Sequence, residues 1–283
     1  MRKDDKRNID IDYETAHDRA RLARDVYKND KHEDNGIGDW VEVVRSDAFD
    51  LPKHSSGFIG GFYMRVDDET GETEYAIVYS GMDGIDDLED AITLAVIGYP
   101  KQFYDAYIFA QEIAEAYDID LKTTDFVGHS MGGYLAQSVG IACGAEKMWM
   151  YNSPSMRIKD IESIGKQLLE KLSDDMHVCL KDMNFENLGK RIESFRTRND
   201  VVARLGNSQR TVLESGVEMR PHSIETLEKL LLNAANAEDG HRASFNEKSI
   251  NNGVISRFTD EVGDRARDMI SSFVSSRKPG KWF

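Results

Sequence analysis

Residues 123–143 read Thr-Thr-Asp-Phe-Val-Gly-His-Ser-Met-Gly-Gly-Tyr-Leu-Ala-Gln-Ser-Val-Gly-Ile-Ala-Cys. An apolar strand pattern ends at Val127, a helical pattern follows Ser130, and Gly128-His129-Ser130-Met131-Gly132 joins the two. A serine on such a tight turn projects its hydroxyl outward, and the flanking glycines let the backbone pass. The following helix directs its free N–H groups toward the point where an oxyanion would form. We therefore predict that Ser130 is a nucleophile; the alternative is a purely structural Gly-rich turn.

Strand and helix patterns alternate on both sides of this stretch. Helices are predicted over residues 13–27, 102–117, 158–172, 224–235 and 260–274, and further strands over residues 40–44, 58–66, 74–79, 147–151, 192–196 and 210–213. This alternation favours an α/β sheet with helices on both faces. With only 5 prolines and no Ser/Gly-rich tract, nothing reads as a linker. We expect a single domain over residues 1–283, with an N-terminal helical segment (1–39) and a C-terminal helical extension (237–283).

The composition narrows the possible partners and the location. A formal charge of −15 over 283 residues argues against nucleic acid and against tight binding to anionic membranes. No run approaches eighteen apolar residues, so no membrane span is expected. The charged start has no apolar region after it, so we expect no signal peptide and a cytoplasmic location, with signal-independent export as the alternative. Cys143 and Cys179 lie in apolar surroundings that favour inert thiols.

A serine nucleophile needs an imidazole to take its proton and a carboxylate to orient that imidazole. In folds with this turn, the order along the chain is serine, acid, histidine. Asp200 follows the predicted strand 192–196, and the carboxyl ends of strands are where α/β sheets build their sites. We predict that Asp200 is the acid, the alternative being an ordinary turn or cap residue.

Three of the seven histidines follow the predicted nucleophile and are candidates for the base. His222 lies between a predicted strand and a predicted helix, a junction that suits an exposed base. The alternative for His222 is a surface residue beside the helix cap Ser223. His241 lies in a polar loop, and His177 precedes the predicted acid. We predict that His222 is the base.

Two backbone N–H groups are predicted to form the oxyanion hole. One belongs to Met131, the residue after the predicted nucleophile, and the other to Met82, just past the strand 74–79. Both would act through the backbone, so their side chains need not be polar.

These motifs together resemble the class 3 lipase family, the fungal-lipase-like branch of the α/β hydrolases, and are closest to its compact bacterial members. The segments that carry the resemblance stand in the family's order and span roughly residues 58–230: Ala76–Asp83, Asp87–Asp90, Val127–Ala136, Tyr151–Pro154, Asn199–Val202 and His222. The resemblance implies an α/β-hydrolase-like, mostly parallel sheet. It also implies hydrolysis of carboxylic esters by Ser130, Asp200 and His222.

The chain departs from the family pattern in two places. Ser80-Gly81-Met82 stands where members usually carry Arg-Gly-Thr or Arg-Gly-Ser, so the hydroxyl that supplements the oxyanion hole is absent. The spacing between acid and base is also shorter than in the fungal enzymes. An inactive binding protein with the same fold is therefore an alternative, as is a hydrolase of another acyl bond such as a thioester.

An apolar segment within residues 86–103 follows the oxyanion loop at the place where class 3 lipases carry a lid. It is either a mobile lid with transient contact to a lipid interface or a packed helix or loop. The substrate expected from these observations is an acyl ester or lipid. Neither a metal nor an organic cofactor is called for by the proposed chemistry.

Overall fold

A seven-stranded sheet forms the centre of the molecule, with its strands in sequential order β1-β2-β3-β4-β5-β6-β7. The computed structural model describes residues 11–28, 37–49, 57–67, 70–81, 102–155, 188–198, 200, 202–204, 211–213 and 222–236. Within these ranges the first three strands are antiparallel and the last five, which share β3, are parallel. The prediction of a mostly parallel α/β sheet is thereby confirmed.

The antiparallel part is a meander of three strands. Strand β1 (Val41–Arg45) pairs with β2 (Gly60–Val66), and β2 pairs with β3 (Thr73–Tyr79). A 3₁₀ helix, η1 (Ser46–Ala48), follows β1. Edge strand β1 carries a register irregularity between Glu42 and Val44. Bulges of this kind twist an edge strand and discourage pairing with other chains.

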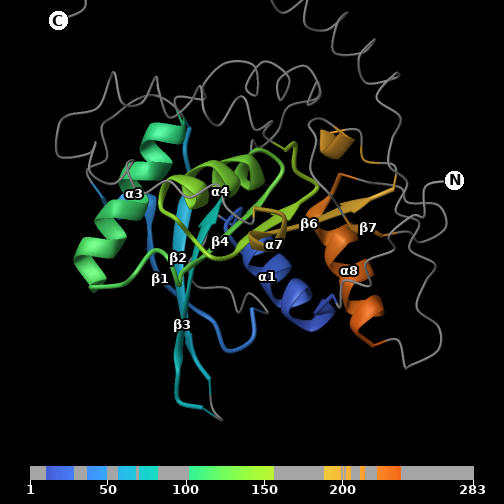
Figure 1. Ribbon diagram of the computed structural model, residues 1–283, viewed down its shortest axis with the longest axis horizontal. Coiled ribbons are helices and arrows are strands. Elements are labelled where there is room, and N and C mark those ends of the chain that lie inside the picture. Colours follow the sequence, from blue (N-terminus) through green and yellow to red (C-terminus); the bar gives the residue numbers. More distant parts are fainter. Residues whose placement is uncertain are drawn as a thin grey trace, which may run out of the picture.

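The parallel part contains β4 (Asp125–His129), β5 (Met148–Tyr151), β6 (Ile192–Thr197) and β7 (Thr211–Leu213). Helix α3 (Gln102–Tyr117) connects β3 to β4, and α4 (Met131–Ala142) connects β4 to β5. Because successive crossovers step in one direction and are normally right-handed, their helices belong on the same face of the sheet. Figure 1 shows α3 and α4 together on one side.

The opposite face is covered by helices from the two ends of the described chain. Helix α1 (Tyr13–Asp25) precedes the sheet and α8 (Ile224–Ala235) follows β7; the two pack on each other and on the central strands (Figure 1). Asp12 and Ser223 cap their N-termini by accepting backbone N–H bonds. The one-turn α7 (Leu188–Arg191) and the 3₁₀ helix η2 (Val202–Arg204) flank β6. Helices on both faces were predicted and are present.

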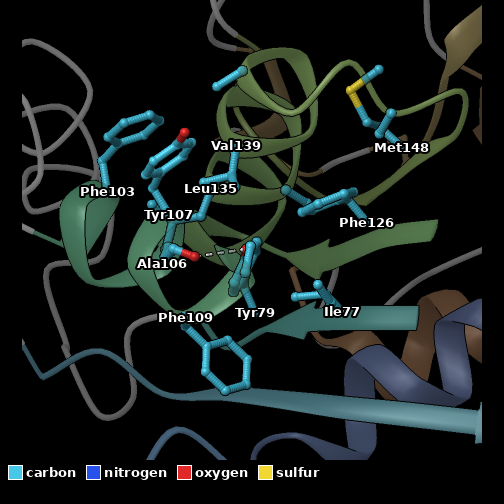
Figure 2. Packing of buried hydrophobic residues seen from close by; sticks show 14 of the residues in the cluster. Ile77, Tyr79, Phe103, Ala106, Tyr107, Phe109, Phe126, Leu135, Val139 and Met148 are labelled. Atoms are coloured by element: carbon cyan, nitrogen blue, oxygen red, sulfur yellow. Dashed lines mark hydrogen bonds between the residues drawn. The ribbon is translucent and has the colours of Figure 1, made fainter. Parts of the chain in front are cut away.

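Alternate residues of the strands supply two separate cores. Ile77, Tyr79 and Phe126 point toward α3 and α4, where they pack with aromatic and aliphatic residues of those helices (Figure 2). Val78 and Val127 point toward α1 and α8. In the first core the buried Tyr79 hydroxyl donates to the Ala106 carbonyl at 3.0 Å. This period of two is what places His129, two residues after Val127, on the α1/α8 side.

Several predictions fall on residues that the structure does not describe. These are the helices at 158–172 and 260–274, the extension 237–283, the cysteine Cys179, and most of the segment 86–103, of which only Gln102 and Phe103 are described, at the start of α3. Among the described helices, none combines the length and apolar character that crossing a bilayer requires.

Candidate active site

Ser130 lies on the turn between β4 and α4 with a strained backbone. Its φ is 56° and its ψ is −127°, values that residues with a side chain rarely adopt and that cost of order 1–3 kcal/mol. The Ser130 N–H donates to the Tyr151 carbonyl at 2.9 Å, which extends the β4–β5 pairing by one residue and holds the turn. Ser130 is almost completely buried and lies at the carboxyl end of the parallel strands.

The glycines around Ser130 permit this turn because helix and sheet come very close together. A Cβ on Gly128 would meet the backbone of Gly132, and a Cβ on Gly132 would meet the Tyr79 carbonyl. A side chain at either position would therefore force α4 away from the sheet. The spacing of the motif reflects this steric requirement.

Asp200 follows β6 and is almost completely buried, with 1% of its surface exposed. One carboxylate oxygen accepts the Val202 N–H at 3.1 Å, and the other accepts the Ala203 N–H at 3.3 Å. Asp200 thus caps η2 while facing the site. The predicted role and the alternative of a cap residue are compatible, because the same carboxylate caps η2 and lies within hydrogen-bonding distance of His222.

His222 connects Asp200 to Ser130. Its Nδ1 lies 3.0 Å from an Asp200 carboxylate oxygen, and its Nε2 lies 3.0 Å from the Ser130 hydroxyl oxygen. Because a carboxylate only accepts, Nδ1 carries the proton and Nε2 is free to accept from the serine. The three predicted residues come from positions 130, 200 and 222 and meet at hydrogen-bonding distance, while the alternative bases His177 and His241 lie outside the described residues.

His129, inside the motif, is a second imidazole beside His222. The two ring centroids are 4.9 Å apart, and only 6% of His129 is exposed. Burial lowers the pKa of His129 from 6.5 to about 3, and the neighbouring His222 acts in the same direction. His129 is therefore neutral at physiological pH.

Of the two predicted oxyanion donors, the structure describes one. Met131 is the first residue of α4, so its N–H is among those that have no partner within the helix, and it adjoins Ser130. Met82 lies outside the described residues, which end at Gly81 in this part of the chain. The role of both as donors stays a prediction.

The structure adds residues around the site that the sequence did not single out by chemistry. Asn152, noted only as part of a motif, has a φ of 43° and accepts the Thr197 N–H at 2.9 Å, which joins the ends of β5 and β6 just before Asp200. Tyr27, directly beyond α1, contacts His129 and Gly81. No local pattern could have revealed Tyr27, because its partners are more than fifty residues away.

The site combines a strained serine after a parallel strand with a histidine and a buried aspartate. This arrangement is typical of the α/β-hydrolase fold. Residues 18–238 match the family model described as the Tle-like phospholipase domain of the phospholipase-like group. The chain therefore belongs to this family. The finer resemblance, to class 3 lipases, stays a prediction.

Two solved structures share a distant likeness with the chain. The extracellular lipase LipA from Serratia marcescens is 13% identical with a TM-score of 0.38, covering 71% of this chain and 40% of its own. The carboxylesterase EstE1, cloned from a metagenomic library, is 15% identical with a TM-score of 0.31, covering 79% of this chain and 94% of its own. The chain thus spans well under half of the lipase. No curated protein matches it significantly. The fold class rests on the sheet order and connections rather than on these likenesses.

Proposed function

We propose that the chain is a serine hydrolase that cleaves carboxylic esters of lipids, by a Ser-Asp-His triad and an acyl-enzyme intermediate. The observation that carries the proposal is the continuous line from Asp200 through His222 to Ser130, with both hydrogen-bonding distances at 3.0 Å. A nucleophile, a base and a group that orients the base are the minimal set for acyl transfer.

In the first half-reaction the Ser130 oxygen attacks the ester carbonyl carbon while His222 Nε2 takes the hydroxyl proton. Asp200 holds the Nδ1–H and stabilises the imidazolium that forms. The carbonyl π electrons move to the oxygen, giving a tetrahedral oxyanion. The N–H groups of Met131 and Met82 would donate to this oxyanion, the former aided by the positive end of the α4 dipole.

The intermediate collapses when the bond to the leaving alcohol breaks and His222 returns its proton to the alcohol oxygen. A water molecule then attacks the acyl-Ser130 carbonyl, with His222 Nε2 taking a proton from that water. When the second intermediate collapses, the bond between the acyl carbon and the Ser130 oxygen breaks and His222 Nε2 returns its proton to that oxygen, which releases the carboxylic acid and restores the Ser130 hydroxyl. Every step uses groups of the chain and water alone.

Membership of the phospholipase-like family supports a lipid ester, and in particular a phospholipid, as the substrate. The class 3 lipase resemblance supports the same kind of bond. The triad itself does not discriminate among leaving groups, so the ester preference has to be established by comparing an ester, a thioester and an amide of equal acyl length.

The proposal is tested with Ser130→Ala and a matched control, Ser138→Ala. Ser138 is a buried serine within α4, the helix that follows Ser130, and its hydroxyl donates to the Leu135 carbonyl. Hydrolysis of p-nitrophenyl butyrate and of phosphatidylcholine should fall by at least about 10³-fold in Ser130→Ala and stay within a few-fold of wild type in Ser138→Ala.

Hydrolysis that survives in Ser130→Ala would refute the proposal. A folded wild-type protein that hydrolyses none of the esters would favour the alternative, a binding protein that keeps the fold.

A further inference from the structure

His129 is buried between the N-terminal segment and the histidine that we propose as the base. Its Nε2 lies 2.7 Å from the backbone carbonyl oxygen of His222. Its Nδ1 lies 2.9 Å from the hydroxyl of Tyr27. The same Tyr27 hydroxyl accepts the Gly81 N–H at 2.8 Å. A continuous polar chain therefore runs from the loop after β3 to the backbone of His222.

The donor and the acceptor of each of these three hydrogen bonds follow from the chemistry of the groups. A carbonyl oxygen only accepts, so the Nε2 of His129 must carry the proton and donate to His222. Because the imidazole is neutral, its Nδ1 is then an acceptor and receives the Tyr27 O–H. Tyr27 in turn accepts from Gly81. These three directions are mutually consistent; the His129 carbonyl, 3.4 Å from the Tyr27 hydroxyl, is a more distant acceptor for the same proton than Nδ1 at 2.9 Å.

We infer that His129 and Tyr27 are positioning residues that hold the backbone of His222 and the loop after β3 in register around Ser130. This inference rests on the proposed function, because it assigns His222 the role of base. His222 begins the short stretch that leads into α8, and within the described residues its backbone is tied toward β4 by the carbonyl bond to His129. A shift of about 1 Å at a reacting group can lower a rate about 10²-fold.

At its other end, this series of hydrogen bonds reaches Gly81, the residue before the predicted oxyanion donor Met82. A Cβ at Gly81 would meet the Tyr27 hydroxyl, the His129 carbonyl and the Ser130 side chain, so only glycine lets the loop come this close. Since the Gly81 N–H donates to Tyr27, it holds the backbone at Gly81 in place rather than serving as an oxyanion donor. The next N–H, that of Met82, keeps the donor role proposed above.

Tyr27 comes from the segment before the sheet, outside residues 58–230, which carry the family resemblance. Helix α1 packs against β4, β5 and α8 and thereby carries Tyr27 to the site. The N-terminal segment is on this account part of the active site, although it supplies no reacting group.

Two substitutions at His129 separate positioning from simple space filling. In His129→Gln the side-chain amide N–H falls near the original Nε2 and can still donate to the His222 carbonyl. In His129→Asn the shorter side chain places its amide near the original Nδ1, where it can only reach Tyr27. Both remove the ring and are similarly polar, so each serves as the control for the other.

We expect His129→Asn to lower kcat about 10- to 100-fold with KM nearly unchanged, and His129→Gln to stay within about fivefold of wild type. Tyr27→Phe, which keeps the ring and loses only the hydroxyl, should lower kcat about tenfold. The rate of inactivation by a fluorophosphonate should fall in parallel, because it depends on the same serine and histidine. Tyr79→Phe removes the hydroxyl of a fully buried tyrosine on the other face of the sheet and should lower Tm alone.

Equal kcat in His129→Gln and His129→Asn, or losses that simply follow Tm across all four variants, would overturn the inference. Should the His129 variants fail to fold, a wild-type kcat in Tyr27→Phe would overturn it equally. Ser130→Ala and His222→Ala are measured alongside. Full activity in those two variants contradicts the proposed function, whereas their inactivity combined with an unaffected His129→Asn contradicts only the positioning role.

Discussion

Ser130 shows how much of the site depends on single residues. Its unfavourable backbone angles persist because three features hold the same turn in place. These are the hydrogen bond to the Tyr151 carbonyl, the close contact of Gly128 with Gly132, and the start of α4. Strain of this kind is found where a side chain has to be presented in one orientation. The imidazole and carboxylate aligned with it come from two other loops, so no residue of the site is positioned by its own element alone.

The buried His129 gives a prediction for stability against pH. Its pKa is lowered by burial to about 3 in the folded protein, whereas an unfolded chain has the usual value of 6.5. Between these values the unfolded state binds a proton that the folded state does not. The stabilisation is therefore complete above about pH 6.5 and is lost as the pH falls toward 3, by up to about 1.4 kcal/mol per pH unit.

Replacing His129 by Gln removes this titration. Urea unfolding at pH 4, 5, 6 and 7 should give a free energy of unfolding that falls less steeply toward acid in His129→Gln than in wild type. The difference between the two slopes should approach one proton. Identical slopes would contradict the burial of a neutral imidazole at this position.

Residue roles could be predicted from the sequence only where a local pattern encodes them. Ser130 could be predicted as the nucleophile because strand, glycines and helix are contiguous, and Asp200 could be predicted as the acid because it follows a strand. The contact of His222 with Ser130 spans 92 residues and depended on the order rule for this fold. Tyr27 was not predictable, because neither its composition nor its spacing distinguishes it from a residue at the end of any amphipathic helix.

At the scale of elements, the sequence patterns located closely those predicted helices and strands that lie within the described residues. The predicted helix at 102–117 coincides with α3, and that at 224–235 coincides with α8. Apolar periodicity indicated the extent of both helices, and the polar Ser223 caps the start of α8. The strand order was not predictable in the same way, since period-two patterns fix which face a residue occupies but not which strands are neighbours.

The close approach of α4 to the sheet gives a prediction at this scale. A methyl group at Gly132 would meet the Tyr79 carbonyl, which is backbone of β3 and cannot rotate aside. We expect Gly132→Ala to lower the free energy of unfolding by about 3 kcal/mol or more. Thermal and urea unfolding measure the change.

Gly140→Ala is the matched control in the same helix. There the added methyl would meet only side-chain atoms, Cγ and Sδ of Met148 and the Phe126 ring, and Met148 can change its rotamer. Alanine also favours the helix by about 1 kcal/mol over glycine. Its free energy of unfolding should change by about 1 kcal/mol or less. Comparable losses in the two variants would argue against a backbone contact as the reason for the motif's second glycine.

In the whole molecule, α1 joins parts that are distant in the sequence. The buried Arg19 on this helix bonds Asp125 of β4 at 2.7 Å and Glu74 of β3 at 2.6 Å, and it also bonds its neighbour Asp18. On the same helix face, apolar residues pack into the core shared with α8. Both the ion pairs and the core hold Tyr27 beside the site.

Removing this buried charge should therefore weaken the entire fold. Arg19→Met leaves the Asp125 carboxylate buried without its guanidinium, which is expected to cost about 3–5 kcal/mol. Lys147→Met removes the exposed ion pair with Glu193 and should change stability by about 1 kcal/mol or less. A cooperative urea transition followed by circular dichroism measures both. Equal effects would mean that α1 is not integral to the folded domain.

We predict that Ser130 is an activated nucleophile. Covalent labelling of its hydroxyl is the most direct test of this prediction. The folded wild-type protein is treated with a fluorophosphonate and digested, and the modified peptide is sequenced by mass spectrometry. We expect one label per chain on Ser130, no label in Ser130→Ala, and labelling slowed at least about 10²-fold in His222→Ala. A wild-type protein that is folded and remains unlabelled, or one that is labelled at another residue, would contradict this prediction.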